Sequence, residues 1–183
     1  MHESEAARPV LVVDLDGTLI RSDMLYESFW SAFARDWRAP LHAMAGLAQG
    51  RAALKARLAA LAPPDPASLP YVSEMLDEIR AWRASGGRTA LVTAADRHLA
   101  ESIASHLGLF DEVHASDGTT NLKGEAKAAL LRERFGPRGF VYAGDHAIDL
   151  AVWKDAAGAI SVGAAPELRA RIDALHPEAR HLA

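Results

Sequence analysis

The chain has 183 residues, half of them hydrophobic, a formal net charge of −4 and no cysteine. This length supports one folded domain and leaves room for a small second lobe, while the lack of cysteine excludes disulfides and thiolate metal sites. The slightly acidic balance gives no electrostatic reason to expect nucleic acid or an anionic membrane as a partner. The first residues do not resemble a signal peptide, and no apolar run reaches the roughly 18 residues that span a bilayer. We therefore expect a cytoplasmic protein with no membrane span in this chain.

Five short apolar runs predict β-strands. The first, at residues 10–13, consists only of Val and Leu, which is typical of a strand buried on both faces. The other runs lie at residues 89–95, 112–116, 140–144 and 159–163. Helical patterns lie between them, so the order of the elements predicts an α/β fold in which helices cover both faces of a parallel sheet.

Residues 97–110 and 121–136 show the helical patterns most clearly. In the first segment apolar residues recur at four-residue steps, and Gly108 follows as a C-terminal cap. In the second segment Asn121 is the candidate N-cap. Parallel sheets gather their chemistry at the carboxyl ends of the strands, so functional residues are expected where each apolar run stops.

Residues 22–84 interrupt this alternation because they contain no convincing strand. We interpret them as a small α-helical cap inserted after the first strand, and residues 9–21 and 85–183 as the core domain. Four-residue steps predict a helix at residues 24–37, whereas the Pro-rich connection at residues 62–70 cannot be helical throughout.

Two more helices are predicted in the cap, at residues 50–62 and at residues 71–87, where the chain leads back to the sheet. The first cap helix carries several aromatic side chains, among them Tyr26, Trp30 and Phe33. That is more apolar surface than one solvent-facing helix usually carries, so we expect these rings to be buried in the cap or in a contact.

Two aspartates end the first strand, in the sequence DLDGTL. Asp14 and Asp16 are two residues apart, so both side chains can face one pocket. Gly17 permits a tight turn in which N–H groups approach a ligand, and Thr18 adds a hydroxyl or an N–H. A lone Asp-x-Asp is often only a turn cap, so its interpretation depends on the other strand ends.

A second pair of acids lies in GDHAIDL, again at the end of an apolar run. Asp145 sits where the strand would give way to a helix, and Asp149, one turn later, would face the same way. Four carboxylates at two strand ends would repel one another without a cation. A hard, oxygen-binding ion relieves this repulsion, so we predict a Mg²⁺ site.

The other strand ends supply groups that suit a phosphate. Thr93 offers a hydroxyl, and the N–H of Ala94 is free to bond an anion. Lys123 lies at the predicted start of a helix and adds a positive charge. Lys127, one turn later, competes for the same role, but we expect a solvated helix lysine there because it lies farther from the strand end. Together these groups predict phosphoryl transfer, in which positioning and charge stabilisation dominate.

These pieces, in this order, resemble the haloacid dehalogenase superfamily of phosphohydrolases. The matching sequences are DLDGTL, LVTAA, LKGEAK and GDHAIDL, which extend over most of the chain. The resemblance implies a Rossmann-like sheet with strand order 5-4-1-2-3, in which the first strand is central. It also implies that Asp14 is the nucleophile that forms an aspartyl-phosphate, and that Asp16 is the acid and base.

The same resemblance implies roles for the remaining site residues. Thr93 and Lys123 would hold the phosphoryl oxygens. An acid at position 16 favours phosphate esters as substrates, because the dehalogenase members of the superfamily lack it. The implied Mg²⁺ ligands are Asp14, Asp145, the backbone carbonyl of Asp16 and, directly or through a partner, Asp149.

Within the superfamily, LKGEAK and GDHAID look most like the phosphoserine phosphatase branch. That branch reads the substrate amino group with a Glu nine residues after the nucleophile; here the position is Asp23, which fits the N-cap of the first cap helix equally well. His146 and Ile148 replace a Gly and an Asn of its fourth motif. Longer stretches, above all ASDGTTNLKG, resemble the phosphatase-like domain that precedes some membrane prenyltransferases of the 4-hydroxybenzoate polyprenyltransferase type.

The sequence therefore predicts a Mg²⁺-dependent phosphatase that acts on a small phosphate monoester. The alternative is a non-catalytic, regulatory domain that partners or is fused to a membrane prenyltransferase, at the cytoplasmic face of the membrane. A response-regulator receiver domain also arranges acids, Thr and Lys around Mg²⁺, but the inserted cap and the late GDHAID motif count against it.

Overall fold

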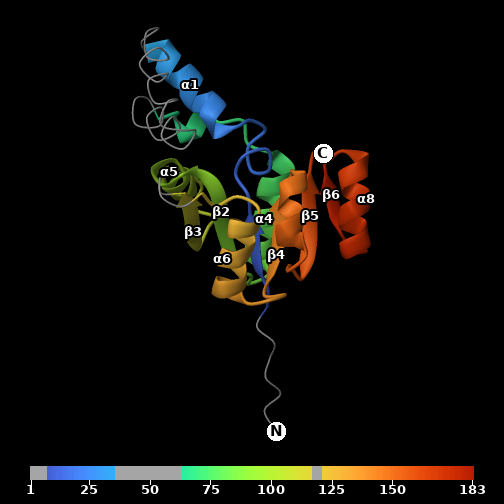
Figure 1. Ribbon diagram of the computed structural model, residues 1–183. Helices are drawn as coiled ribbons and strands as arrows, with labels where there is room; N and C mark the ends of the chain where they lie inside the picture. The colour runs from blue at the N-terminus through green and yellow to red at the C-terminus, as the bar shows by residue number, and fades with distance from the viewer. Residues whose placement is uncertain (1–7, 36–62, 117–120) are drawn as a thin grey trace.

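The computed structural model describes residues 8–35, 63–116 and 121–183 (Figure 1). Its strands are β1 Val10–Val13, β2 Thr89–Asp96, β3 Glu112–Ser116, β4 Phe140–Gly144, β5 Gly158–Val162 and β6 Arg180–Leu182. Its helices are α1 Met24–Arg35, α4 Ser73–Ala84, α5 Arg97–Leu107, α6 Glu125–Phe135, α7 Leu150–Trp153 and α8 Pro166–Leu175, with short 3-10 turns η1 Pro66–Ser68 and η2 Ala147–Asp149.

The strands form one parallel sheet in the order β3-β2-β1-β4-β5-β6. β1 is central, and the predicted order of the first five strands is confirmed. The sixth strand was not predicted. It joins the sheet beside β5, where the Ser161 hydroxyl lies 2.6 Å from Nδ1 of His181, and the other ring nitrogen of His181 lies 2.9 Å from Asp173 of α8.

Helices cover both faces of the sheet because β1 alternates its side chains between two hydrophobic clusters. Leu11 and Val13 belong to one cluster, which also holds buried residues of α4 and α5. Val10 and Val12 belong to the other, together with residues of α6, α7 and α8. All four β1 residues are buried, as the continuous apolar run predicted.

The helix α4 packs with the core sheet. Its residues Met75 and Ile79 are fully buried in the cluster that contains Leu11 and Leu91. This packing favours an inserted segment that ends before α4, rather than at residue 84. The division into core and cap stays a prediction, and the helix expected at residues 50–62 lies outside the described residues.

The helix α1 extends away from the sheet (Figure 1). Tyr26, Trp30 and Phe33 are 58%, 47% and 44% exposed, and neighbouring rings along this row contact each other edge to face. The expectation that these three rings are buried in the cap is therefore wrong, because they are exposed and pack against one another along one side of the helix. Their burial in a contact stays a prediction. Among the residues that the structure describes, no helix combines the length and the apolar character needed to cross a bilayer.

Two predicted helix boundaries have different outcomes. Gly108 ends α5 in the left-handed conformation, with φ 62°, so its role as a C-terminal cap is confirmed. Asn121 does not cap α6, because the helix begins at Glu125 after Gly124, whose φ is 57°. A left-handed backbone favours glycine, and the chain turns into the helix there, several residues later than predicted.

Candidate active site

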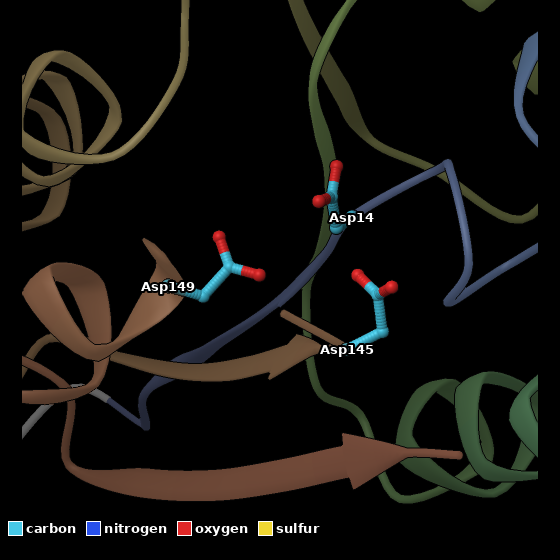
Figure 2. A group of neighbouring side chains, drawn as sticks. All are labelled: Asp14, Asp145 and Asp149. Carbon is cyan, nitrogen blue, oxygen red and sulfur yellow. The ribbon is translucent and has the colours of Figure 1, made fainter. Parts of the chain in front are cut away.

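Three carboxylates meet at the carboxyl ends of the two central strands. Asp14 follows β1, Asp145 follows β4, and Asp149 closes the turn η2. Figure 2 shows the three side chains directed toward a common space, and one oxygen from each lies within 4.8 Å of the others. Because β1 and β4 are paired neighbours, with the Asp14 N–H donating to the Ala143 carbonyl at 3.0 Å, the sheet itself brings these acids together.

Two glycines make room for the carboxylates. Gly17 has φ 73°, and a Cβ there would lie 2.2 Å from Oδ2 of Asp145. A Cβ at Gly144 would lie 2.9 Å from Oδ2 of Asp149. The loop after β1 can therefore approach the second acid pair closely only because position 17 has no side chain. The Gly17 N–H donates to the Ser22 carbonyl at 3.3 Å, so in this structure it serves the loop.

The carboxylates repel one another in a partly buried setting. Burial, followed by the charges of Asp14 and Asp149, raises the pKa of Asp145 to about 7. Burial also raises the pKa of Asp149, and Lys127 opposes that rise. Three hard oxygen donors at this spacing, whose charged forms disfavour each other, fit a divalent cation. The residues that could hold it are Asp14, Asp145 and Asp149.

The cation that contacts Asp14 is Lys127. Its ammonium is 3.0 Å from Oδ2 of Asp14 and 2.9 Å from the hydroxyl of Tyr142, and the residue is only 2% exposed. The expectation of a solvated lysine at position 127 is therefore wrong. The reason is the late start of α6, which puts Lys127 in the first helical turn, buried against β4. Lys123 is exposed and lies before the helix.

Tyr142 is a site residue that sequence reasoning missed. It lies in β4, is fully buried, and its hydroxyl donates to Oδ1 of Asp149 at 3.1 Å. An aromatic residue in a buried strand is indistinguishable by pattern from ordinary core. For Lys127 a signal does exist, since the Gly in LKGEAK marks the helix start and leaves the second lysine inside the helix.

Asp16 lies outside the three-carboxylate cluster. Its Oδ1 accepts the N–H of Met24, the first residue of α1, at 2.7 Å. The side chain of Thr18 is fully buried and its N–H donates to the Leu15 carbonyl at 3.4 Å, so this residue serves the turn in the present structure. The expected catalytic role of Asp16 and the binding roles of Gly17 and Thr18 stay predictions.

The remaining predicted site residues lie at β2 and at the start of α1. Thr93 is fully buried, and its hydroxyl accepts the Ala95 N–H at 3.0 Å, while Ala94 is half-buried. Asp23 is exposed immediately before α1, and its carbonyl accepts the N–H of Glu27 at 3.0 Å. This placement is compatible with both the capping and the substrate-binding interpretation of Asp23. The roles of all three stay predictions.

The backbone around Asp149 is held by a reciprocal pair of hydrogen bonds. His146 precedes η2, and its Nδ1 accepts the N–H of Ile148 at 3.3 Å. In return, Oδ2 of Asp149 accepts the N–H of His146 at the same distance. The histidine that replaces a glycine in the fourth motif thus caps the turn that carries a site carboxylate.

The family model for haloacid dehalogenase-like hydrolases matches residues 11–154. The chain belongs to this family. The match runs from the β1 strand to the residue after α7, so it includes every member of the carboxylate cluster and Lys127. In this haloacid dehalogenase-like hydrolase, the acids therefore belong to the part of the chain that defines the family.

Other proteins resemble the chain over nearly its full length. A protein of Sinorhizobium fredii named uncharacterized protein y4nM is 44% identical over 172 residues, which is 94% of this chain but 33% of the relative. The chain thus spans about a third of that relative. A Bordetella pertussis protein of unknown function has a similar structure, with TM-score 0.69, 20% identity and coverage of 96% and 98% of the two chains.

A phosphoserine phosphatase solved with bound substrate shares the fold as well. Its TM-score is 0.64 at 18% identity, and the comparison covers 97% of this chain and 94% of that one. At this identity the likeness concerns the fold. This chain is thus a haloacid dehalogenase-like hydrolase with phosphoserine phosphatase-like structural neighbours and a cluster of three aspartates.

Proposed function

We propose that the chain is a Mg²⁺-dependent phosphatase that hydrolyses a small phosphate monoester through an aspartyl-phosphate at Asp14. The observation that carries this proposal is the contact between Asp14 and the buried ammonium of Lys127, beside the carboxylates of Asp145 and Asp149. One carboxylate with its own cation, next to acids that fit a metal ion, is an arrangement suited to a nucleophile that attacks an anionic group.

Asp14 is held in one orientation by contacts on both of its oxygens. The N–H of Leu15 donates to Oδ1 at 2.8 Å, and Lys127 contacts Oδ2 at 3.0 Å. A phosphate that approaches three carboxylates is repelled, so its binding requires compensating positive charge. Lys127 supplies one such charge at the nucleophile, and we assign it the phosphate-holding role that the sequence suggested for Lys123.

The proposed reaction has two steps. An oxygen of Asp14 attacks phosphorus, the bond to the ester oxygen breaks, and the carboxyl of Asp16 gives its proton to the departing oxygen. Asp16 then takes a proton from water as the water oxygen attacks the same phosphorus, the bond to Asp14 breaks, and inorganic phosphate leaves. The hydrogen bond from Met24 to Asp16 ties the position of this acid to the first residue of α1.

The metal ligands in this proposal are Asp14, Asp145 and Asp149, with the backbone carbonyl of Asp16 as a further donor implied by the family resemblance. When bound, Mg²⁺ would supply Lewis-acid stabilisation of the negative charge on the phosphoryl oxygens. Thr93 and the N–H of Ala94 are proposed to bind those oxygens, and Asp23 to contact the substrate beyond its phosphate.

The regulatory alternative has one observation in its favour. The y4nM relative is about three times as long as the aligned region, so domains of this kind occur within longer proteins. Association with a membrane prenyltransferase rests on the sequence resemblance alone and stays a proposal. Turnover distinguishes the two functions, because only a phosphatase releases phosphate repeatedly.

The test measures phosphate release from a panel of sugar, amino-acid and prenyl phosphates, with Mg²⁺ and with chelator. We expect release to require both Mg²⁺ and Asp14, so that Asp14→Asn abolishes turnover. Asp77→Asn is the matched control, because Asp77 is 74% exposed on α4 and pairs only with Arg80 among the described ion pairs. Absence of release from every ester, in folded protein that binds Mg²⁺, would refute the phosphatase and favour the regulatory domain.

A further inference from the structure

The ring of Tyr142 lies in an apolar cluster, and the side chain carries a single polar atom, its hydroxyl oxygen. Its ring packs edge to face on Trp153, with ring centres 5.8 Å apart, and the Trp153 indole N–H donates to the Tyr142 carbonyl at 3.0 Å. The residue is fully buried in the cluster between β4 and the helices α6 and α7. A phenylalanine would fill nearly the same volume, so the hydroxyl must be explained by its contacts.

The chemistry of the partners fixes the direction of both hydrogen bonds. An ammonium has only donors, so Lys127 must donate to the Tyr142 oxygen at 2.9 Å. The phenolic proton is then available to Oδ1 of Asp149, 3.1 Å away.

We propose that Tyr142 is a positioning residue whose single hydroxyl holds both Lys127 and Asp149 in their working orientations. The ammonium assigned to phosphate, on Lys127, and the carboxylate assigned to the metal, on Asp149, are thereby both held by the strand β4. This inference rests on the proposed function, because it assigns Lys127 to phosphate and Asp149 to the metal.

The geometry explains why one atom serves both sides. The ammonium of Lys127 contacts two polar groups, the Asp14 carboxylate and the Tyr142 hydroxyl, so the hydroxyl helps to define where the ammonium lies relative to the nucleophile. The carboxylate of Asp149 receives the Tyr142 hydroxyl on one oxygen and the longer His146 N–H contact on the other. Loss of the hydroxyl therefore loosens a phosphate-binding group and a metal-binding group together.

The experiment is Tyr142→Phe in the full chain. Mg²⁺ affinity is measured by calorimetry without substrate, and inorganic phosphate affinity by its inhibition of turnover and by calorimetry with Mg²⁺ present. Groups that orient metal ligands typically contribute about 10–100-fold to affinity or activity, so we expect both affinities to fall by at least about 10-fold, with a similar loss in kcat. Tyr71→Phe is the control, because its hydroxyl donates to the Pro66 carbonyl at 2.9 Å and lies outside the carboxylate cluster.

The outcomes separate positioning from packing. Unchanged affinities and unchanged kcat in folded Tyr142→Phe would overturn the proposal, because the ring alone would then be sufficient. A loss of Mg²⁺ affinity with phosphate affinity unchanged would also overturn it, since the hydroxyl would then act on one side only. Loss of both, with the thermal unfolding temperature close to wild type and with Tyr71→Phe unaffected, would support it.

A measurement on the wild-type protein covers the case in which the variant does not fold. A hydroxyl that is buried and donates to a carboxylate should give a slowly exchanging proton NMR signal that shifts when Mg²⁺ is added. The chain has three tyrosines, so Tyr26→Phe and Tyr71→Phe assign the signal by elimination. A Tyr142 hydroxyl proton that is absent from the spectrum, or insensitive to Mg²⁺, would overturn the proposal.

Failure of the proposed function is distinguishable from failure of this inference. If the wild type binds Mg²⁺ and phosphate but releases none from any ester, the phosphatase is refuted, while the effect of Tyr142→Phe on the two affinities still decides the inference. If the wild type is an active phosphatase and Tyr142→Phe equals it, only the inference fails. If neither ligand binds the wild type, both fail.

Discussion

The choice between Lys127 and Lys123 gives the most direct test of the site. Lys127→Met removes an ammonium from a side chain that is 3% exposed and lies 3.0 Å from Asp14. At that distance two unit charges attract by about 5–6 kcal/mol at an effective dielectric constant of about 20. The cost of burying the ammonium offsets part of this attraction, so we expect a net loss of about 3–4 kcal/mol in transition-state stabilisation.

A loss of that size lowers kcat by about 10²–10³-fold. The assay is phosphate release at saturating Mg²⁺, with the best ester from the panel and with circular dichroism to establish folding. Lys123→Met is the matched control, because it removes the same charge from an exposed position before α6, and we expect it to change kcat by less than about 2-fold. If Lys123→Met were the damaging variant and Lys127→Met retained wild-type turnover, the assignment of the phosphate-holding lysine would be wrong.

Three further predictions concern the Gly17 backbone, the effect of Mg²⁺ on stability and the ion pair of Asp111 with Arg83. Gly17→Ala should lower the unfolding free energy by about 1–2 kcal/mol, because an alanine is strained in the left-handed backbone there, and should also weaken Mg²⁺ binding, because the new Cβ meets Asp145. The control is Gly86→Ala, at φ 81° with open space around the added Cβ, which should lower stability in urea unfolding and leave Mg²⁺ affinity in calorimetry unchanged. Mg²⁺ at about 100 times its dissociation constant should stabilise the protein by about 2.7 kcal/mol, which raises the unfolding temperature by about 5–10 °C, and Asp145→Asn should lose most of that rise. Burial acts to raise the pKa of Asp111, but hydrogen bonds from Thr89 and the charge of Arg83 outweigh burial and hold this pKa below its ordinary value. The resulting stabilisation is present above the unfolded-state pKa and is lost as the pH falls through the folded-state pKa. In urea unfolding at pH 7, Asp111→Asn should therefore be less stable than wild type by about 0.5–1 kcal/mol, a modest figure because the ion pair is partly exposed. The difference should vanish in acid.

Most of the sheet was predictable because the strands β1, β2, β4 and β5 are largely buried. A short, continuous apolar run such as Val10–Val13 has few interpretations other than a buried strand, and the helices between the runs favour the parallel arrangement. β6 escaped prediction because Arg180–Leu182 is short, partly exposed and polar at two of its three positions. Its place in the sheet depends on pairing with β5 and on the contacts of His181, which no local pattern contains.

The acids of the site were predicted from their position at strand ends, whereas the lysine that contacts Asp14 was predicted to be solvated. Two lysines four residues apart both suit a helix, and the choice between them depends on where α6 begins. Asn121 suggested an early start, whereas Gly124, with its left-handed backbone, delays the helix to Glu125. The role of Tyr142 was not predicted for a different reason. Its hydroxyl contacts Lys127 and Asp149 only once the sheet and α6 have packed together.

The pairing of β1 with β4 also determines when the site can exist during synthesis. Asp14 leaves the ribosome early, whereas Asp145 and Asp149 follow only after β2, β3 and α6 have been made. Contacts between such distant segments carry a large loop-closure cost and form late. The cluster therefore cannot assemble until β4 has left the ribosome. Metal binding would then mark the pairing of β1 with β4 rather than the start of sheet formation.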